Sequence, residues 1–264
     1  MPKIIHDFFP EENNHNQNID NTYLYHYSNI DAVINILETE QIWLSHVSQM
    51  NDSSEGKLIL EKASNIHNAS IYYHMLLKNY YLCSFSGYGN LLSQWRGYGD
   101  VNIGFSRDEL VSTLRFIEDA DGEVLDTSGV QFTGCDYINV DDKDFDDIVE
   151  ETKNKLLHLV DIDKIDLQRK LLGIGSVCFS LKHSGFRQES ESRIIAYLWN
   201  RKPFEIKGKK YIKFRFDTNV IRRIVIGPSK DQTEKTKKII EYLNKNKKYS
   251  KVEVYYSGIP FSGV

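Results

Sequence analysis

Residues 221–256, IRRIVIGPSKDQTEKTKKIIEYLNKNKKYSKVEVYY, carry the clearest structural pattern in the chain. Ile221–Ile226 has the apolar composition of a buried strand, a Gly-Pro pair ends it, and Thr233–Leu243 has helical periodicity. Val252–Tyr256 has the pattern of a second strand. A strand, a helix and a strand in this order predict a βαβ unit.

Further elements are predicted upstream of this unit. The predicted strands are Tyr23–Tyr27, Ile42–Leu44, Tyr80–Ser84, Val101–Phe105, Glu191–Tyr197, Phe204–Lys207 and Lys210–Phe216. The predicted helices are Ile30–Leu37, Ala69–Lys78, Leu91–Tyr98, Ser106–Phe116 and stretches that begin near Phe145 and Asp163. Together they predict a mixed α+β fold with a split, antiparallel-rich sheet and packed helices.

Turn and capping signals refine this scheme. Ser28 is placed to cap the first helix, and Ser106 followed by Glu109 has the spacing of a capping box. Gly208 predicts a hairpin between the strands on either side of it, and Glu123–Val140 has the pattern of a second hairpin.

The sequence predicts a single domain over residues 21–264. Residues 1–20 are polar and Asn-rich with no apolar period, so we expect a flexible N-terminal arm there. The rest of the chain shows no internal repeat and no Pro- or Ser-rich linker that would mark a domain boundary.

Composition narrows the class of protein. Of the 264 residues, 41% are hydrophobic and 27% are charged, and no apolar run is long enough to span a bilayer. The first residues lack the pattern of a secretory signal, so we expect a cytoplasmic protein without a membrane anchor. The three cysteines, Cys83, Cys135 and Cys178, fit neither a disulfide framework nor a zinc site, and we expect buried thiols.

Charge is unevenly distributed along the chain. The net charge is −4, yet residues 201–251 hold 17 Lys and Arg against 5 Asp and Glu. A basic segment of this kind can contact nucleic-acid phosphates, although Lys-rich helix faces also serve solubility alone.

Two segments combine groups that can bind a nucleotide. His26 ends a strand beside Tyr27, where the imidazole can hydrogen-bond a sugar and the ring can stack. Residues 84–99 bring together Ser84, Trp95, Arg96 and Tyr98, which supply a hydroxyl, two aromatic rings and a cation for a phosphate. The alternative is structural, with His26 and Tyr27 in the core and Trp95 and Tyr98 filling it at i and i+3.

A third segment supplies carboxylates. On an extended chain, Glu189, Glu191 and Arg193 lie on one face because side chains alternate with a period of two. Carboxylates at the entrance of a buried strand often have displaced pKa values and mark functional sites. The alternative is an exposed strand end with an ion pair.

Other motifs predict structure rather than chemistry. The acidic run Asp141–Asp147 lacks the Gly and Glu of a calcium-binding loop, and Asp52 with Glu55 is explained by helix capping. Pro228 removes a donor from the Gly227-Pro228-Ser229 turn, which we interpret as structural. We predict no metal site, and no Walker loop, zinc-protease or serine-hydrolase motif is present.

Several motifs occur in a fixed order along the chain. They are Leu24–Tyr27, Ile42–Ser45 running to Asn51–Glu55, Ser93–Gly99 to Gly104-Phe105, Lys182–Phe186 to Glu189–Arg193, and Ser257–Phe261. Taken together, they resemble a bacterial family called domain of unknown function 2971. Their order covers the chain from about Tyr23 to its end.

The front of the pattern is also similar, more loosely, to ADP-ribosyltransferases of the His-Tyr-Glu type. That resemblance implies that His26 holds the ribose of NAD⁺, that Tyr98 stacks on nicotinamide, that Glu191 is the catalytic carboxylate and that Arg96 holds the diphosphate. The second Tyr is also matched by Tyr80, Tyr81 or Tyr88, and Glu189 is an alternative to Glu191.

The resemblance therefore implies a NAD⁺-consuming effector that acts in toxicity or phage defence on a nucleic-acid or protein target. Two alternatives stay open at this point. One is a non-catalytic module that binds nucleic acid or a partner protein. The other is a metal-assisted nuclease that uses His26, Asp52 and Glu191.

Overall fold

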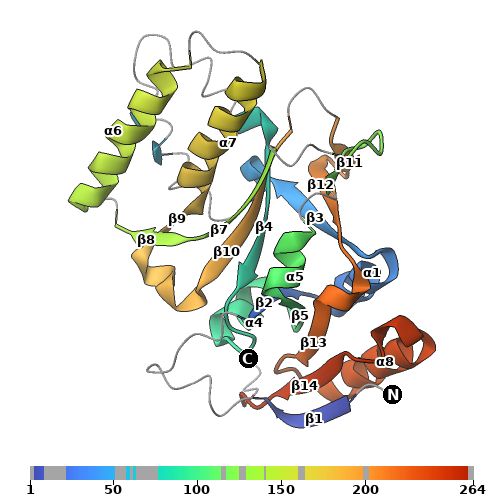
Figure 1. Cartoon of the computed structure of the whole chain (residues 1–264). Coiled ribbons are helices and arrows are strands. Elements are labelled where there is room, and N and C mark those ends of the chain that lie inside the picture. The colour runs from blue at the N-terminus through green and yellow to red at the C-terminus, as the bar shows by residue number, and fades with distance from the viewer. Residues whose placement is uncertain are drawn as a thin grey trace. The chain divides into compact units, whose positions relative to one another are not determined.

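The computed structural model describes residues 3–8, 22–50, 58–59, 62–63, 77–113, 117–124, 129–139, 141–159, 164–198 and 202–260. The chain forms two compact units. Unit 1 comprises Met1–Gln41, Phe85–Thr113 and Phe216–Val264, and unit 2 comprises Ile42–Ser84 and Leu114–Arg215. Because the two units are interleaved along the chain, no compositional boundary marks them. The elements are labelled in Figure 1.

Unit 1 contains a five-stranded run of sheet in the order β1-β14-β13-β5-β2, joined at β2 by the end of β4. Its strands are β1 (Lys3–Phe8), β14 (Glu253–Ser257), β13 (Ile221–Ile226), β5 (Val101–Ser106) and β2 (Tyr23–Ser28). Its helices are α1 (Ile30–Thr39), α4 (Leu92–Tyr98), α5 (Arg107–Ser112) and α8 (Gln232–Lys245), with 3-10 turns η4 (Thr218–Val220) and η5 (Lys247–Tyr249).

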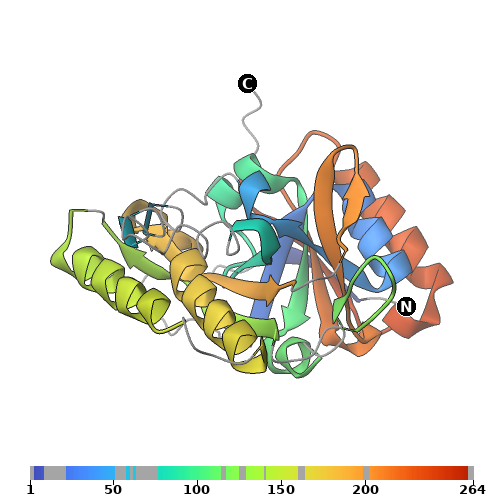
Figure 2. The same ribbon diagram turned by 90° about the horizontal axis from the view of Figure 1, so that it is seen from above.

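The βαβ unit is confirmed. Strands β13 and β14 pair in parallel and α8 connects them. Helices α1 and α8 lie side by side (Figures 1 and 2), where the Lys238 ammonium lies 2.7 Å from the Asp31 carboxylate. The Tyr249 hydroxyl also donates to the Leu37 carbonyl at 2.5 Å. Within unit 1, the first contact joins α8 to α1 and the second joins η5 to α1.

Three local predictions in unit 1 need correction. Strand β1 pairs in parallel with β14, so Lys3–Phe8 of the predicted arm forms a strand, whereas residues 9–21 lie outside the described part. Helix α1 is capped by Asn29, whose side-chain oxygen accepts from the Ala32 amide at 2.9 Å, and not by Ser28. Ser106 precedes α5 without a side-chain cap, and the Glu109 carboxylate accepts from Arg222 at 2.6 Å, so the predicted capping box does not form.

Unit 2 contains the strand order β4-β3-β12-β11, with β10 pairing with both β4 and β7, and β6 pairing with β12. Its strands are β3 (Gln41–His46), β4 (Tyr80–Ser86), β6 (Ile117–Glu118), β7 (Val130–Gly134), β10 (Glu191–Tyr197), β11 (Phe204–Ile206) and β12 (Lys209–Arg215). A separate parallel pair joins β8 (Asp136–Ile138) to β9 (Leu181–His183).

Helices α6 (Lys143–Leu157) and α7 (Lys164–Ser180) belong to unit 2, with 3-10 turns η1 (Val47–Gln49) and η3 (Ser184–Glu189). Tyr80 of β4 and Phe179 of α7 share a buried cluster, with ring centroids 5.1 Å apart. Gly175 provides the room, because a Cβ there would lie 2.0 Å from the Tyr80 ring. This close approach holds α7 against the sheet of unit 2.

The hairpin across Gly208 is confirmed, because β11 and β12 pair antiparallel around Lys207 and Gly208, which have φ of 51° and 73°. Positive φ at both turn residues is the requirement of a type I′ turn. The hairpin predicted within 123–140 is wrong for β7, which pairs antiparallel with β10 instead. The predicted helix over 69–78 and the Asp52–Glu55 cap lie outside the described residues except for 77–78.

The predicted fold class is confirmed as mixed α+β with a mostly antiparallel sheet and several helices. Among the described residues, no helix has both the length and the apolarity required to cross a membrane.

Candidate functional site

The predicted site residues belong to both units. His26, Tyr27, Trp95, Arg96 and Tyr98 lie in unit 1, whereas Ser84, Glu189 and Glu191 lie in unit 2. Each group therefore forms a local environment of its own.

In unit 1, His26 and Tyr27 point to opposite faces of the sheet, because neighbouring side chains on a strand alternate. The His26 ring lies 5.7 Å from Phe85, whereas the Tyr27 ring lies 4.5 Å from Trp95. The Tyr27 hydroxyl donates to the Tyr88 carbonyl at 2.8 Å. The two residues predicted as one binding pair are thus separated by the sheet itself.

Trp95 is largely a core residue. Only 7% of it is exposed, and its indole N–H donates to the Asn90 side chain at 3.0 Å. A Cβ on Gly227 would lie 2.7 Å from the indole, so this glycine is needed for the close packing. Tyr98, at 47% exposure, does not share this core environment. The expectation that both rings fill the core at i and i+3 holds for Trp95 alone.

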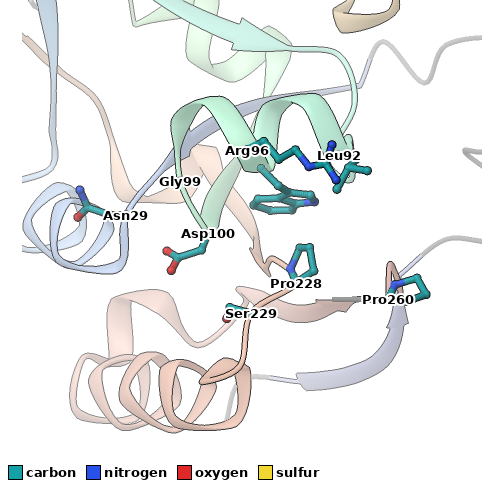
Figure 3. A pocket seen from close by; sticks show the side chains of 9 residues that line it. Asn29, Leu92, Arg96, Gly99, Asp100, Pro228, Ser229 and Pro260 are labelled. Atoms are coloured by element: carbon teal, nitrogen blue, oxygen red, sulfur yellow. The ribbon is translucent and has the colours of Figure 1, made fainter. Parts of the chain in front are cut away.

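A pocket of about 430 Å³ lies beside Trp95 in unit 1 (Figure 3). It is lined by Asn29, Leu92, Trp95, Arg96, Gly99, Asp100, Pro228, Ser229 and Pro260. Figure 3 shows the helix that carries Arg96 on one side and the Pro228-Ser229 turn on the other. The pocket thus joins the aromatic-basic motif to the turn before α8, which we had interpreted as structural only.

The charges around this pocket are partly neutralised. Lys235 pairs with both Asp100 and Asp231, and its ammonium also donates to the Ser229 hydroxyl at 3.2 Å. Arg96 is exposed at the rim, where a guanidinium suits the oxygens of a phosphate. The wall at Gly99 is fixed, because φ is 142° there and a Cβ would lie 2.2 Å from the Ser28 carbonyl oxygen.

Unit 2 contains a buried cluster of four charges. The Lys182 ammonium lies 2.6 Å from a Glu189 oxygen and 2.5 Å from a Glu191 oxygen. The other Glu191 oxygen accepts from Arg193 Nε at 2.6 Å. Each of the four side chains is at most 7% exposed. We call Lys182, Glu189, Glu191 and Arg193 the charge cluster.

Further hydrogen bonds fix the charge cluster in place. Arg193 donates to the Phe179 carbonyl at 2.5 Å, and the Glu191 amide donates to the Tyr137 hydroxyl at 2.6 Å. The Cys135 amide donates to the Glu191 carbonyl at 2.8 Å. Buried charges are tolerated when they are paired and hydrogen-bonded in this way.

The cluster keeps Glu191 ionised. Burial alone would raise the pKa of this carboxyl group, but the charges of Arg193 and Lys182 outweigh it and lower the pKa to about 2. For two neighbouring groups burial dominates, and it raises the pKa of Cys135 and of Tyr137 to about 12. At neutral pH, Glu191 is therefore charged while the neighbouring thiol and phenol are neutral.

The sequence prediction for this segment is partly wrong. Glu189 ends the 3-10 turn η3, and β10 begins at Glu191 after Ser190, which has a left-handed φ of 44°. Glu191 and Arg193 therefore lie on one face of the strand, whereas Glu189 lies outside it. Both carboxylates still meet at Lys182, which sequence reasoning missed, as it missed Tyr137. No local pattern around Leu181-Lys182-His183 pointed to this contact.

The remaining predictions concern cysteines and metals. Cys83 and Cys178 are buried as expected, but Cys135 is only partly buried. Among the described residues, no group of three or more His, Cys, Asp and Glu side chains could hold a metal ion. Asp142 precedes helix α6, and Asp52 lies outside the described residues. Ser84 lies on β4, which pairs with the Glu191-bearing strand β10.

Comparisons with known proteins give limited information. No protein-family model matches the chain, and no curated protein matches its sequence. Among solved structures, the chain is similar to Thermus sp. 2.9 DarT in complex with ADP-ribosylated ssDNA, with 12% identity and a TM-score of 0.35. The match covers 90% of this chain and 94% of that chain. A likeness this distant gives no information about the activity of this protein.

Proposed function

We propose that this protein is an ADP-ribosyltransferase-like enzyme that consumes NAD⁺, with Glu191 as the catalytic carboxylate. The observation that carries the proposal is the buried charge cluster, in which Lys182 and Arg193 hold the Glu191 carboxylate in a fixed position and lower its pKa. A fully charged carboxylate in fixed geometry suits a reaction in which positive charge develops on a sugar.

The proposed reaction breaks the bond between nicotinamide and the ribose of NAD⁺. The bonding electron pair leaves with the nicotinamide nitrogen, so positive charge develops on the ribose ring. Each Glu191 oxygen accepts from one cation and keeps a second acceptor site, through which the carboxylate stabilises that charge and orients the ribose 2′-hydroxyl without breaking its ion pairs. A nucleophile of the target, or water, then forms the new bond to the ribose carbon and gives up its proton.

The other predicted residues have proposed binding roles. In unit 2, Ser84 is proposed to hydrogen-bond the ribose. In unit 1, His26 is proposed to donate to a sugar, Tyr98 to stack on a base and the exposed Arg96 to hold a phosphate. Tyr27 and Trp95 support the binding surface from the core, and Glu189 positions Lys182 against Glu191. Membership in the domain of unknown function 2971 family and a role in toxicity or phage defence are part of this proposal.

The test is the release of nicotinamide from NAD⁺ by purified protein. We expect Glu191→Gln to lower the rate by about 100- to 1,000-fold, the usual cost of removing one stabilising group from a transition state. Glu151→Gln is the control, because Glu151 is an exposed carboxylate of the same unit outside the charge cluster, and its loss should leave the activity unchanged.

Folding of both variants is checked by circular dichroism. If Glu191→Gln does not fold, Glu191→Asp replaces it, because aspartate keeps the negative charge while moving the carboxylate back by one methylene. Equal rates in wild type and a folded Glu191 variant would refute the assigned role. Absence of nicotinamide release would instead support the non-catalytic alternative.

A metal-assisted nuclease is disfavoured by the same geometry. Both carboxylate oxygens of Glu191 already accept from cations, one from Arg193 and the other from Lys182. Binding a metal there would break these interactions and bring a third positive charge into the cluster. Nucleic-acid cleavage that stops on adding a chelator would overturn this conclusion.

A further inference from the structure

Unit 2 presents an aromatic sheet surface that the proposed reaction does not use. It is formed by neighbouring strands β3, β12 and β11 (Figure 1). Phe204 and Tyr211 are direct cross-strand partners, and the rings of Tyr211 and Trp43 lie 5.3 Å apart. Phe204, Tyr211 and Trp43 therefore lie on one side of three adjacent strands, which we call the aromatic face.

The aromatic face is accessible. Its three rings are only partly buried, and Ile206, two residues after Phe204 on the same side, is 42% exposed. On the opposite side of β12, Ile212 and Phe214 are completely buried. The even-numbered apolar residues of the strand thus face the core, whereas its odd-numbered aromatic residue, Tyr211, is only partly buried.

Positive charge accompanies these rings. Lys209 and Lys213 flank Tyr211 at the strand period of two, and the Lys213 ammonium lies 3.9 Å from the centre of the Phe204 ring. The acidic Glu205 pairs with Lys210 on the opposite side of the hairpin. Glu118, beside Lys213, is neutralised by Arg215 at 3.2 Å.

We propose that the aromatic face binds single-stranded nucleic acid. Unpaired bases stack on exposed aromatic rings regardless of sequence, and neighbouring lysines attract the phosphates between them. Three rings on adjacent strands suit about two or three bases, as in other sheet surfaces that bind RNA. A duplex offers no free base faces to these rings, so it is the poorer partner. This partner assignment goes beyond the proposed NAD⁺ chemistry and does not depend on Glu191.

The test measures binding of a fluorescent single-stranded oligonucleotide of about 12 nucleotides to the full chain, without NAD⁺, by fluorescence anisotropy. We expect Tyr211→Ala to weaken binding by about 5- to 150-fold, the range found for losing one base-stacking ring. Lys209→Ala should weaken it less and reduce the steepness of its salt dependence.

Lys210→Ala is the matched control, because Lys210 is also exposed and adjacent in sequence but lies on the opposite side of β12. It should leave the affinity nearly unchanged. Equal losses from Lys209→Ala and Lys210→Ala, with no loss from Tyr211→Ala, would show nonspecific charge attraction and overturn the proposal. Tighter binding to a duplex of the same sequence, or binding only to anionic lipid vesicles, would also overturn it.

A second measurement covers the case in which Tyr211→Ala does not fold. Stacking of a base on Trp43 should quench its fluorescence during titration with the oligonucleotide. Trp43→Phe should lose that quenching while retaining most of the affinity, because phenylalanine keeps an aromatic face. Unchanged quenching in the folded Trp43→Phe variant would place the bound strand elsewhere and contradict the proposal. Nicotinamide release by Glu191 variants has no bearing on either readout.

Discussion

The surroundings of Trp95 in unit 1 and of Glu191 in unit 2 show two different ways of burying a conspicuous sequence motif. Trp95 is buried by close packing against Tyr27 and against the backbone of Gly227, which has no side chain. Its indole N–H donates to Asn90. Glu191 is buried because it forms ion pairs with Lys182 and Arg193.

This difference affects where chemistry is expected. Burial of an aromatic side chain lowers the free energy of the folded protein, so its position in the core needs no functional explanation. A buried carboxylate loses hydration free energy that its ion pairs must offset, and apolar residues would often be at least as stable there. The charge cluster is therefore the more informative of the two regions.

The largest expected stability effect is that of Lys182→Met. Removing this ammonium leaves Glu189 and Glu191 buried next to each other without their shared cation. We expect the free energy of unfolding to fall by about 3–5 kcal/mol, as when one partner of a buried ion pair is removed. Urea denaturation measures this, with Lys170→Met on the exposed side of α7 as a control that should change it by less than about 0.5 kcal/mol. Similar values for both variants would contradict the importance of the cluster.

Acid titration tests whether the ionised Glu191 stabilises the folded protein. The pKa of Glu191 is lowered from 4.5 to about 2 in the folded protein, so its ionisation stabilises the fold above pH 4.5 and that contribution is lost as the pH falls towards 2. The difference corresponds to about 3 kcal/mol. Glu191→Gln should flatten the pH dependence of the unfolding free energy in this window. A slope identical to that of the wild type would show that Glu191 has an ordinary pKa.

A smaller loss of stability than that of Lys182→Met is expected in unit 1, at the glycines near Trp95. Gly99→Ala should reduce the free energy of unfolding by about 1–3 kcal/mol, because the new Cβ meets the Ser28 backbone at a φ of 142°. Gly97→Ala is the matched control, since a Cβ there meets nothing within 4 Å and alanine favours the helix by about 0.5–1 kcal/mol. Thermal denaturation of the two variants measures the contrast, and equal destabilisation would contradict this interpretation.

The fold was largely predictable because its strands have strong local signals. The bounds predicted for β13 and β10 agree with the structure, and the Gly208 turn follows from backbone conformations that glycine favours. The partner of β7 was not predictable, because strand pairing between distant segments leaves no local signal. The strand Lys3–Phe8 was missed because the polar, Asn-rich residues that follow it dominated the interpretation, although Ile4, Ile5 and Phe8 are apolar and the strand pairs with β14.

The candidate site was predicted less completely. Glu191 and Arg193 were expected on one face because their spacing alone determines it, and the structure pairs them. Lys182 could not be connected to them, because η3 lies between and its turn decides that the lysine meets both carboxylates. Alternation on β2 likewise separates His26 from Tyr27, a consequence of strand geometry that the prediction of a joint binding pair overlooked.

The most direct test of the central claim is the rate of nicotinamide release from NAD⁺ by the wild-type protein as the pH is lowered from neutrality. We expect nicotinamide release with no loss of activity near pH 4.5, because Glu191 stays ionised down to about pH 2. A rate that falls by half near pH 4.5 through protonation of Glu191, or no release at any pH, would contradict this expectation.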